Sequence, residues 1–212
     1  MFKKYLKMMI ITSIVILLPI VAGLILWNRF PEEVPIHFNM QGEPDGWGSK
    51  TTTVFLMPLL LLAFHWICVF VTTLDPKNKN ITDKNMNLVL WIIPVLSVFE
   101  SGLVYSYALG SKIDINIILP IFFGIGFIII GNFIPKCKQN YTLGIKIPWT
   151  LESEENWNYT HRLAGKTWFF GGIMIIALSF LKNVWIFMAI TIIMVMIPVI
   201  GSYLFHKKEN EQ

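Results

Sequence analysis

Four side chains are of types that could do chemistry where the sequence places them. His37 and Asp45 lie in a polar segment between two apolar runs. A histidine near a carboxylate is a possible acid–base pair. His65 and Glu100 instead lie inside apolar runs, where an ionisable side chain is costly and is by default a functional candidate. The sequence contains no metal-ligand spacing, phosphate loop or nucleophile motif. We therefore expect no metal and no cofactor, and assign no catalytic residue.

The composition indicates which elements must position these side chains. Hydrophobic residues make up 55% of the 212-residue chain and charged residues 14%, against roughly 25% charged residues in soluble domains. The segments that cross the membrane must be helices, because lipid cannot form hydrogen bonds with free backbone N–H and C=O groups. The sequence therefore predicts an all-α polytopic protein whose partner is the lipid bilayer. Its six transmembrane helices are expected at Met8–Trp27, Val54–Thr73, Leu88–Leu109, Ile115–Ile134, Thr167–Leu181 and Val184–Phe205.

The basic residues predict the orientation of the spans. One side carries most of them, namely Lys3, Lys4, Lys7, Lys77, Lys79, Lys84, Lys136, Lys138, Lys146, Arg162, Lys166, Lys207 and Lys208. The opposite side has Arg29, Lys50, Lys112 and Lys182. Because cytoplasmic loops are enriched in lysine and arginine, both termini are predicted to be cytoplasmic. The basic residues lie in short segments between apolar runs, so we expect no direct binding of nucleic acid.

Two loops are long enough to hold a site. We expect an N-terminal two-helix unit at residues 1–75 with an ordered external loop at 30–53. A four-helix unit is expected at residues 86–212, with a cytoplasmic loop at 135–166.

The external loop has the pattern of an ordered lid. Val34, Ile36 and Phe38 alternate with other residues, which favours a short strand. Gln41-Gly42 and Asp45-Gly46 are turn dipeptides, and Pro44 suits a turn. We expect the lid to display His37, Asp45 and Trp47. The alternative is a packed cap in which tryptophan and lysine only anchor helix ends.

The internal loop combines an extended segment with a helix start. Residues 141–149 are expected to lie extended along the lipid headgroups. Ser153 followed by two glutamates is typical of a helix N-terminus. Trp157, His161 and Ala164 then recur at helical spacing, which predicts an interfacial helix running into the fifth span. The alternative is an amphipathic segment that rests on the membrane without a partner.

The intramembrane pair leaves two interpretations open. At 1.5 Å per residue, His65 and Glu100 differ in depth by about 6 Å, so their side chains could just meet. Glu100 could instead be protonated or bond to Ser97, Tyr105 or Tyr107. The pair is either a proton relay or a structural polar contact.

Two long motifs carry a resemblance to a known family. The pattern P-x-x-V-P-I-H-F-N-x-x-G-x-P-D-G-W-x-S-K, at residues 31–50, resembles the loop of a bacterial membrane domain without assigned chemistry. The pattern N-Y-T-L-G-I-K-I-P-W-T-L-x-S-E-E-N-W-x-x-T-H-R-L-A-G, at residues 140–165, resembles the signature of the SdpI family of bacterial immunity proteins. This order of the two is usual in that family.

The resemblance implies roles for both motifs. The external motif would form a toxin-facing or structural loop through Pro35, His37, Gly42, Pro44, Asp45, Trp47 and Lys50. The internal signature would comprise Asn140, Gly144, Pro148, Trp149, Trp157, Thr160, His161 and Gly165. The implied partners are a secreted peptide toxin outside and a transcriptional repressor held at the membrane inside.

From this resemblance we expect a plasma-membrane immunity protein that binds without turnover and is not an enzyme. One alternative is a small proton-coupled transporter or efflux component that works through His65 and Glu100. The other is an intramembrane enzyme acting on lipid or cell-wall precursors. Its acid–base groups would be His37 with Asp45, or His161 with Glu154 or Glu155.

Overall fold

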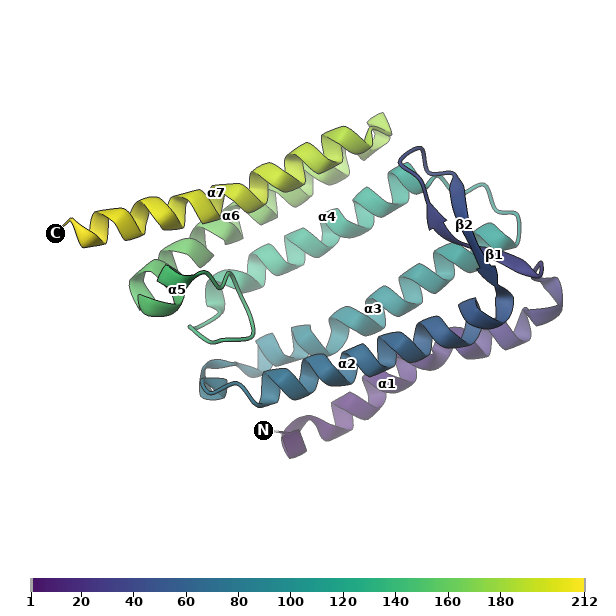
Figure 1. The fold of residues 1–212 in the computed structure, drawn as a ribbon, viewed down its shortest axis with the longest axis horizontal. Coiled ribbons are helices and arrows are strands. Elements are labelled where there is room, and N and C mark those ends of the chain that lie inside the picture. The colour runs from purple at the N-terminus through teal and green to yellow at the C-terminus, as the bar shows by residue number, and fades with distance from the viewer. Residues whose placement is uncertain (1, 212) are drawn as a thin grey trace. The chain divides into compact units, whose positions relative to one another are not determined.

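The computed structural model describes residues 2–211 and is predominantly helical (Figure 1). Within this range six helices are long and apolar enough to cross a membrane, which confirms the predicted number of spans. The long helices are α1 (Phe2–Ile25), α2 (Met57–Thr73), α3 (Asp83–Ala108), α4 (Ile115–Phe133), α6 (Glu154–Leu178) and α7 (Val184–Asn210). A π-helical turn, Thr52–Leu56, precedes α2. The chain is therefore a multi-pass membrane protein.

The fifth span differs most from its prediction. Its apolar run begins at Thr167, but α6 begins at Glu154 and continues unbroken to Leu178. Ser153 caps this helix, because its side chain accepts a hydrogen bond from the Asn156 backbone N–H at 3.1 Å. The predicted helix start is thus confirmed. The signature helix and the fifth span form one continuous element.

The contacts divide the chain into two compact units. Unit 1 comprises the residues up to Leu74 together with Met86–Asp114, and unit 2 comprises Asp75–Asn85 together with the residues from Ile115 onward. This grouping differs from a four-helix unit beginning at residue 86, because α3 packs with the first two helices. Ser97 donates a hydrogen bond to the Ile16 carbonyl at 3.0 Å, and Tyr105 donates one to the Pro19 carbonyl at 3.1 Å.

Unit 1 carries an antiparallel hairpin between α1 and α2 (Figure 1). Strand β1 (Glu33–Phe38) confirms the predicted strand, and it pairs with β2 (Pro44–Ser49). The expectation of a turn at Asp45-Gly46 is wrong, because both residues lie in β2. The turn comes earlier, at Asn39–Gly42, where Gly42 adopts a φ of 80°. Val34 and Phe30 are buried beneath the hairpin with Val54.

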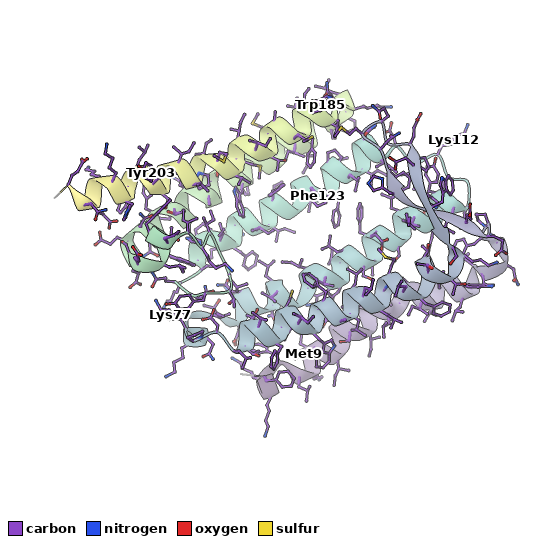
Figure 2. The ribbon with its side chains drawn as sticks, in the orientation of Figure 1. Met9, Lys77, Lys112, Phe123, Trp185 and Tyr203 are labelled. Carbon is purple, nitrogen blue, oxygen red and sulfur yellow. The ribbon has the colours of Figure 1, made fainter. Side chains whose placement is uncertain are left out.

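Unit 2 is built on close packing of α4 against α6. Glycines permit this approach, since a Cβ at Gly131 would lie 2.7 Å from the Phe169 backbone nitrogen and one at Gly124 would lie 2.9 Å from the Gly172 carbonyl oxygen. Helix α7 packs on α6 and leaves large apolar side chains outside. Trp185 and Tyr203, near the two ends of α7, are 64% and 51% exposed (Figure 2). Such an outer face suits lipid.

Candidate functional site

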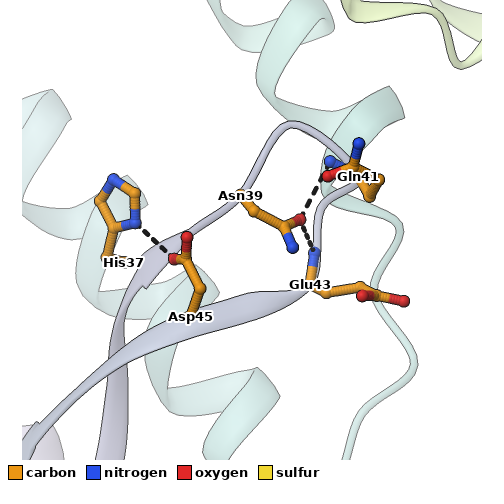
Figure 3. A network of polar contacts seen from close by, with 5 residues as sticks. All are labelled: His37, Asn39, Gln41, Glu43 and Asp45. Carbon is orange, nitrogen blue, oxygen red and sulfur yellow. Dashed lines mark hydrogen bonds and ion pairs between the residues drawn. The ribbon is translucent and has the colours of Figure 1, made fainter.

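The hairpin of β1 and β2 brings His37 and Asp45 into direct contact (Figure 3). His37 Nδ1 lies 2.5 Å from Asp45 Oδ1, across the two strands. Irregular register on both sides of His37 turns its side chain toward this partner. Both side chains remain open to solvent, at 71% and 44% exposure. The arrangement is an exposed hydrogen-bonded pair with a defined geometry.

The hairpin turn is held by Asn39, which sequence reasoning did not single out. Its side-chain Oδ1 accepts hydrogen bonds from the backbone N–H groups of Gln41 and Glu43, at 3.0 and 2.9 Å (Figure 3). The Asn39 N–H in turn donates to the Glu43 carbonyl at 2.8 Å. An asparagine that begins a turn of this kind is a recognisable local signal. The turn places Asp45 beside His37.

The predicted external residues separate into two kinds. Lys50 anchors the base of the hairpin, because its Nζ lies 2.8 Å from Glu32 Oε1 and 5.1 Å from the Trp27 ring centroid. Pro35 is buried in β1, and Gly42 and Pro44 shape the turn and the second strand. Trp47 is 53% exposed. The hairpin therefore displays His37, Asp45 and Trp47 on a rigid support.

The internal signature begins with Asn140, which is almost completely buried. Its Oδ1 accepts from the backbone N–H groups of Thr142 and Leu143, at 2.9 and 2.6 Å. Its Nδ2 donates to the Lys138 and Leu143 carbonyls, at 2.8 and 3.1 Å. One amide side chain therefore folds the segment around itself. This segment bends sharply, so the expected extended conformation of residues 141–149 is wrong.

Asp75, in the loop after α2, is a buried partner that the sequence did not reveal. Its Oδ2 accepts from the Tyr141 backbone N–H and the Thr142 hydroxyl, both at 2.8 Å. Its Oδ1 accepts from the Lys77 backbone N–H at 2.7 Å. A buried carboxylate needs such donors. Asp75 lies in a short polar loop far from the signature in sequence, so no local pattern indicated the contact.

Gln139 joins the same loop to the short helix α5 (Pro148–Glu152). Its Nε2 donates to the carbonyls of Thr150 and Leu151, at 2.9 and 3.0 Å. Its Oε1 accepts from Lys77 Nζ at 2.5 Å. Sequence reasoning missed Gln139, because an isolated glutamine carries no motif.

Trp157 and His161 form the buried centre of the signature. Their rings stack with centroids 4.0 Å apart, and the Trp157 indole donates to the Cys137 carbonyl at 2.7 Å. Both side chains are buried within unit 2. The prediction of an interfacial helix does not describe these two residues, because they pack against protein.

His161 is bonded at both ring nitrogens. Nε2 accepts from the Ile145 backbone N–H at 3.0 Å, so Nδ1 carries the proton that it donates to the Trp157 carbonyl at 2.7 Å. Gly144 lies against these rings with a φ of 116°, and a Cβ there would collide with His161 Nε2. Both ring nitrogens of His161 are thus engaged by backbone groups, and neither contacts Glu154 or Glu155.

The remaining signature residues connect α5, α6 and α7. Trp149 Nε1 donates to Ser202 Oγ at 2.8 Å. Ser202 Oγ donates to Asn156 Oδ1 at 2.6 Å, and Thr160 Oγ1 donates to the same oxygen at 3.0 Å. Pro148 begins α5, and Gly165 lets α6 approach Pro135 closely. The signature is therefore a continuous buried polar network.

Cys137 lies inside this network and is unsuited to thiol chemistry. It is 9% exposed, and its sulfur accepts from Asn85 Nδ2 at 3.2 Å. Burial raises the pKa of the Cys137 thiol to about 11. Because the thiolate is the reactive form, the protonated thiol is inert near neutral pH.

The two intramembrane candidates have separate partners. His65 is fully buried, and its Nε2 lies 3.0 Å from the Thr12 hydroxyl. Glu100 Oε2 accepts from the Ser101 hydroxyl at 3.4 Å. Neither contact joins His65 to Glu100, and both interpretations of the two residues, a proton relay or a structural polar contact, stay predictions. Within residues 2–211, no group of three or more metal-ligating side chains forms a cluster.

The fold and these sites define a six-helix membrane protein with a displayed hairpin on one loop and a buried polar signature in another. The SdpI/YfhL protein family matches residues 136–202, and a domain of unknown function, DUF1648, matches residues 14–62. The chain is 29% identical over 212 residues to the Immunity protein SdpI of Bacillus subtilis (strain 168), covering 96% of this chain and 98% of that protein. The chain is thus similar to the SdpI/YfhL protein family in its C-terminal third and to one immunity protein along nearly its full length. No solved structure matches it significantly.

The matched ranges agree with the two motifs. Residues 14–62 include the whole hairpin, and residues 136–202 include every predicted signature residue. Asp75 lies outside both ranges. The loop that completes the signature network therefore lies outside both matched ranges.

Proposed function

We propose that the chain is an integral membrane immunity protein that protects its cell against a secreted antimicrobial peptide. The observation that carries this proposal is the similarity to an immunity protein along nearly the full length of both chains. The continuous match includes the hairpin and the signature, so the proposal covers the whole protein and not one domain.

The hairpin is the part of the chain best suited to meet the peptide. It holds His37 and Asp45 in direct contact and leaves Trp47 exposed on the same hairpin. A rigid surface loses little conformational entropy on binding, and tryptophan is enriched at binding hot spots. Protection through this surface requires binding alone.

Deletion and complementation in the native strain test the proposal. Cells lacking the gene should die in concentrated culture supernatant of the parent strain, and the wild-type gene should restore survival. A variant with His37→Ala, Asp45→Ala and Trp47→Ala should reach the membrane in normal amount yet fail to restore survival. Glu152→Gln, on exposed α5, is the matched control. Unchanged survival of the deletion strain would contradict the immunity role.

A second role is signalling through a cytoplasmic transcriptional repressor. The support for it is the form of the signature, in which a rigid buried network presents an exposed rim that includes Lys138, Tyr141 and Lys146. Such a rim suits docking of a protein partner. Combined Tyr141→Ala and Lys146→Ala should abolish toxin-induced transcription while survival is retained. If the double variant retained both toxin-induced transcription and survival, the docking role would be contradicted.

A further inference from the structure

The outer edge of β2 is an unpaired strand edge. The sheet has two strands, so β2 has β1 on one side. In residues 2–211, no backbone hydrogen bond beyond this pairing is found for Asp45–Gly48, whereas the Ser49 carbonyl accepts from the Thr53 hydroxyl at 3.2 Å. Exposed edges present N–H and C=O groups that can pair with a further strand.

The register shows which groups face outward. The Lys50 N–H donates to the Glu32 carbonyl at 3.0 Å, which makes these two residues a hydrogen-bonded pair. Pairing alternates along antiparallel strands, so Ser49 opposite Glu33 and Trp47 opposite Pro35 are non-hydrogen-bonded pairs. The N–H and C=O of Trp47 and the N–H of Ser49 therefore point away from β1.

The two edges of the hairpin are not equivalent. On β1 the outward positions are Glu33, which is exposed, and Pro35, which has no N–H and is buried. On β2 the outward positions, Trp47 and Ser49, are both exposed. The β1 edge lacks a hydrogen-bond donor at Pro35, whereas the β2 edge has outward N–H groups at Trp47 and Ser49. The β2 edge is therefore the better side for an added strand.

The charge around this edge indicates the chemistry of its occupant. The chain has a net charge of +4, yet the loop at 30–53 carries Glu32, Glu33, Glu43 and Asp45 against Lys50 alone. Glu32 is bonded to Lys50. Glu33 is exposed and lies on the same side of the sheet as Trp47, because it pairs with Ser49 and side chains alternate between faces. Asp45 is exposed in the irregular part of β2, where it is bonded to His37. Carboxylates next to an exposed indole ring favour lysine or arginine.

We propose that the outer edge of β2 binds an extended cationic peptide segment as a third strand of the hairpin. The inference rests on the proposed function, in that the segment would belong to the secreted antimicrobial peptide. Backbone pairing with Trp47 and Ser49 supplies a general strand contact. Glu33, Asp45 and the Trp47 ring supply the preference for positive charge.

Binding of synthetic probes to the full chain in phosphatidylcholine nanodiscs tests both parts. The probes are capped peptides of about ten residues, long enough for one strand. The first alternates lysine with threonine, and the second alternates glutamate with threonine. The third has the first sequence with alternate backbone nitrogens methylated. Empty nanodiscs give the background.

The lysine probe should bind measurably, and the glutamate probe at least about tenfold more weakly. Methylation should weaken the lysine probe about tenfold or more, because it removes strand hydrogen bonds. Glu33→Gln with Asp45→Asn should reduce affinity about fivefold by removing two exposed charges. Glu152→Gln with Glu155→Gln changes the net charge equally and should leave affinity unchanged.

Three outcomes would overturn the inference. These are equal binding of the two charge types, equal binding of the methylated probe, or no binding of the lysine probe above background. A cell-survival assay reports separately on the proposed function. Glu33→Gln alone, at an exposed position, controls for misfolding of the double variant. If probes fail to bind while the wild-type gene still protects cells, the edge proposal is wrong and immunity stands.

Discussion

Single residues in the signature are fixed by several partners each, and Gly144 shows why the residue type matters. Its φ of 116° lies in the left-handed region, where a side chain is strained, and its α-carbon faces the stacked Trp157 and His161 rings. The ring stack and the bond from the Ile145 N–H to His161 depend on this close approach. Glycine is therefore required here by both conformation and space.

Gly144→Ala should destabilise the protein by about 2 kcal/mol or more, because strain and collision act together. The measurement is thermal unfolding in detergent, followed by circular dichroism. Gly126→Ala is the control, since a Cβ at Gly126 meets nothing within 4 Å. An equal effect of both substitutions would show that the ring contact is unimportant.

Asp75 is the second residue whose role depends on several bonds. Asp75→Asn replaces one acceptor oxygen with an N–H group that faces the donors from Tyr141 and Thr142. We expect a loss of about 1–3 kcal/mol, since buried donors lose their acceptor. Hydrogen exchange should accelerate at the Tyr141 amide, and Glu152→Gln should leave it unchanged. Retained protection in Asp75→Asn would refute the role of this carboxylate.

At this scale the sequence revealed residue types but few partners. Asn140, Trp157 and His161 stand in a dense motif and were singled out from it. Asp75 and Gln139 were not, because their partners lie in other loops or on other elements. Likewise, His37 and Asp45 were named as a pair, but their contact required the strand register.

At the scale of elements, glycine positions decide how closely α4 and α6 approach. A Cβ at Gly172 would lie 2.5 Å from the Gly124 carbonyl oxygen. A Cβ at Gly165 would lie 2.9 Å from the Gly131 carbonyl oxygen. Small residues of this kind allow helix backbones to pack tightly in membranes. The signature network includes Trp157, Thr160 and His161 in the N-terminal part of α6, so this packing also supports the site.

Gly172→Val should separate α4 from α6 and destabilise the protein by about 1–3 kcal/mol, as overpacking does in other interiors. Thermal unfolding again gives the measurement. Gly126→Val places the same side chain at an open position of α4 and should have a smaller effect. If Gly126→Val were the more damaging change, close packing at Gly172 would not be limiting.

The hairpin is the element on which sequence reasoning was partly wrong. Alternation of apolar residues correctly predicted β1, whereas glycine and proline in the second segment suggested a turn. Pro44, Gly46 and Gly48 nevertheless lie in β2. Pairing with β1 outweighed their low strand propensity, and Asn39 with Gly42 supplied the turn instead.

For the whole molecule, orientation in the membrane is the main prediction that rests on charge alone. The lysine and arginine distribution places both termini and the signature loop in the cytoplasm and the hairpin outside. The proposed toxin contact depends on this orientation. The proposed function therefore requires the hairpin to lie outside the cell.

Cysteine labelling in intact cells tests the orientation. Met40→Cys, at an exposed position of the hairpin turn, should react with a membrane-impermeant maleimide. Glu152→Cys should react after permeabilisation alone. Both variants carry Cys68→Ser, and buried Cys137, whose thiol pKa is about 11, should react slowly. Labelling of Glu152→Cys in intact cells would invert the predicted topology.

The sequence by itself determined that the chain spans a membrane with six helices, because long apolar runs have no other stable form in lipid. It also marked the two loops where function concentrates. The tertiary structure decided which residues meet, since Asp75 with Tyr141, Ser97 with Ile16 and Trp149 with Ser202 are joined across long separations in sequence. Hydropathy depends on each residue and its near neighbours, whereas a buried hydrogen bond depends on where two distant backbones come together.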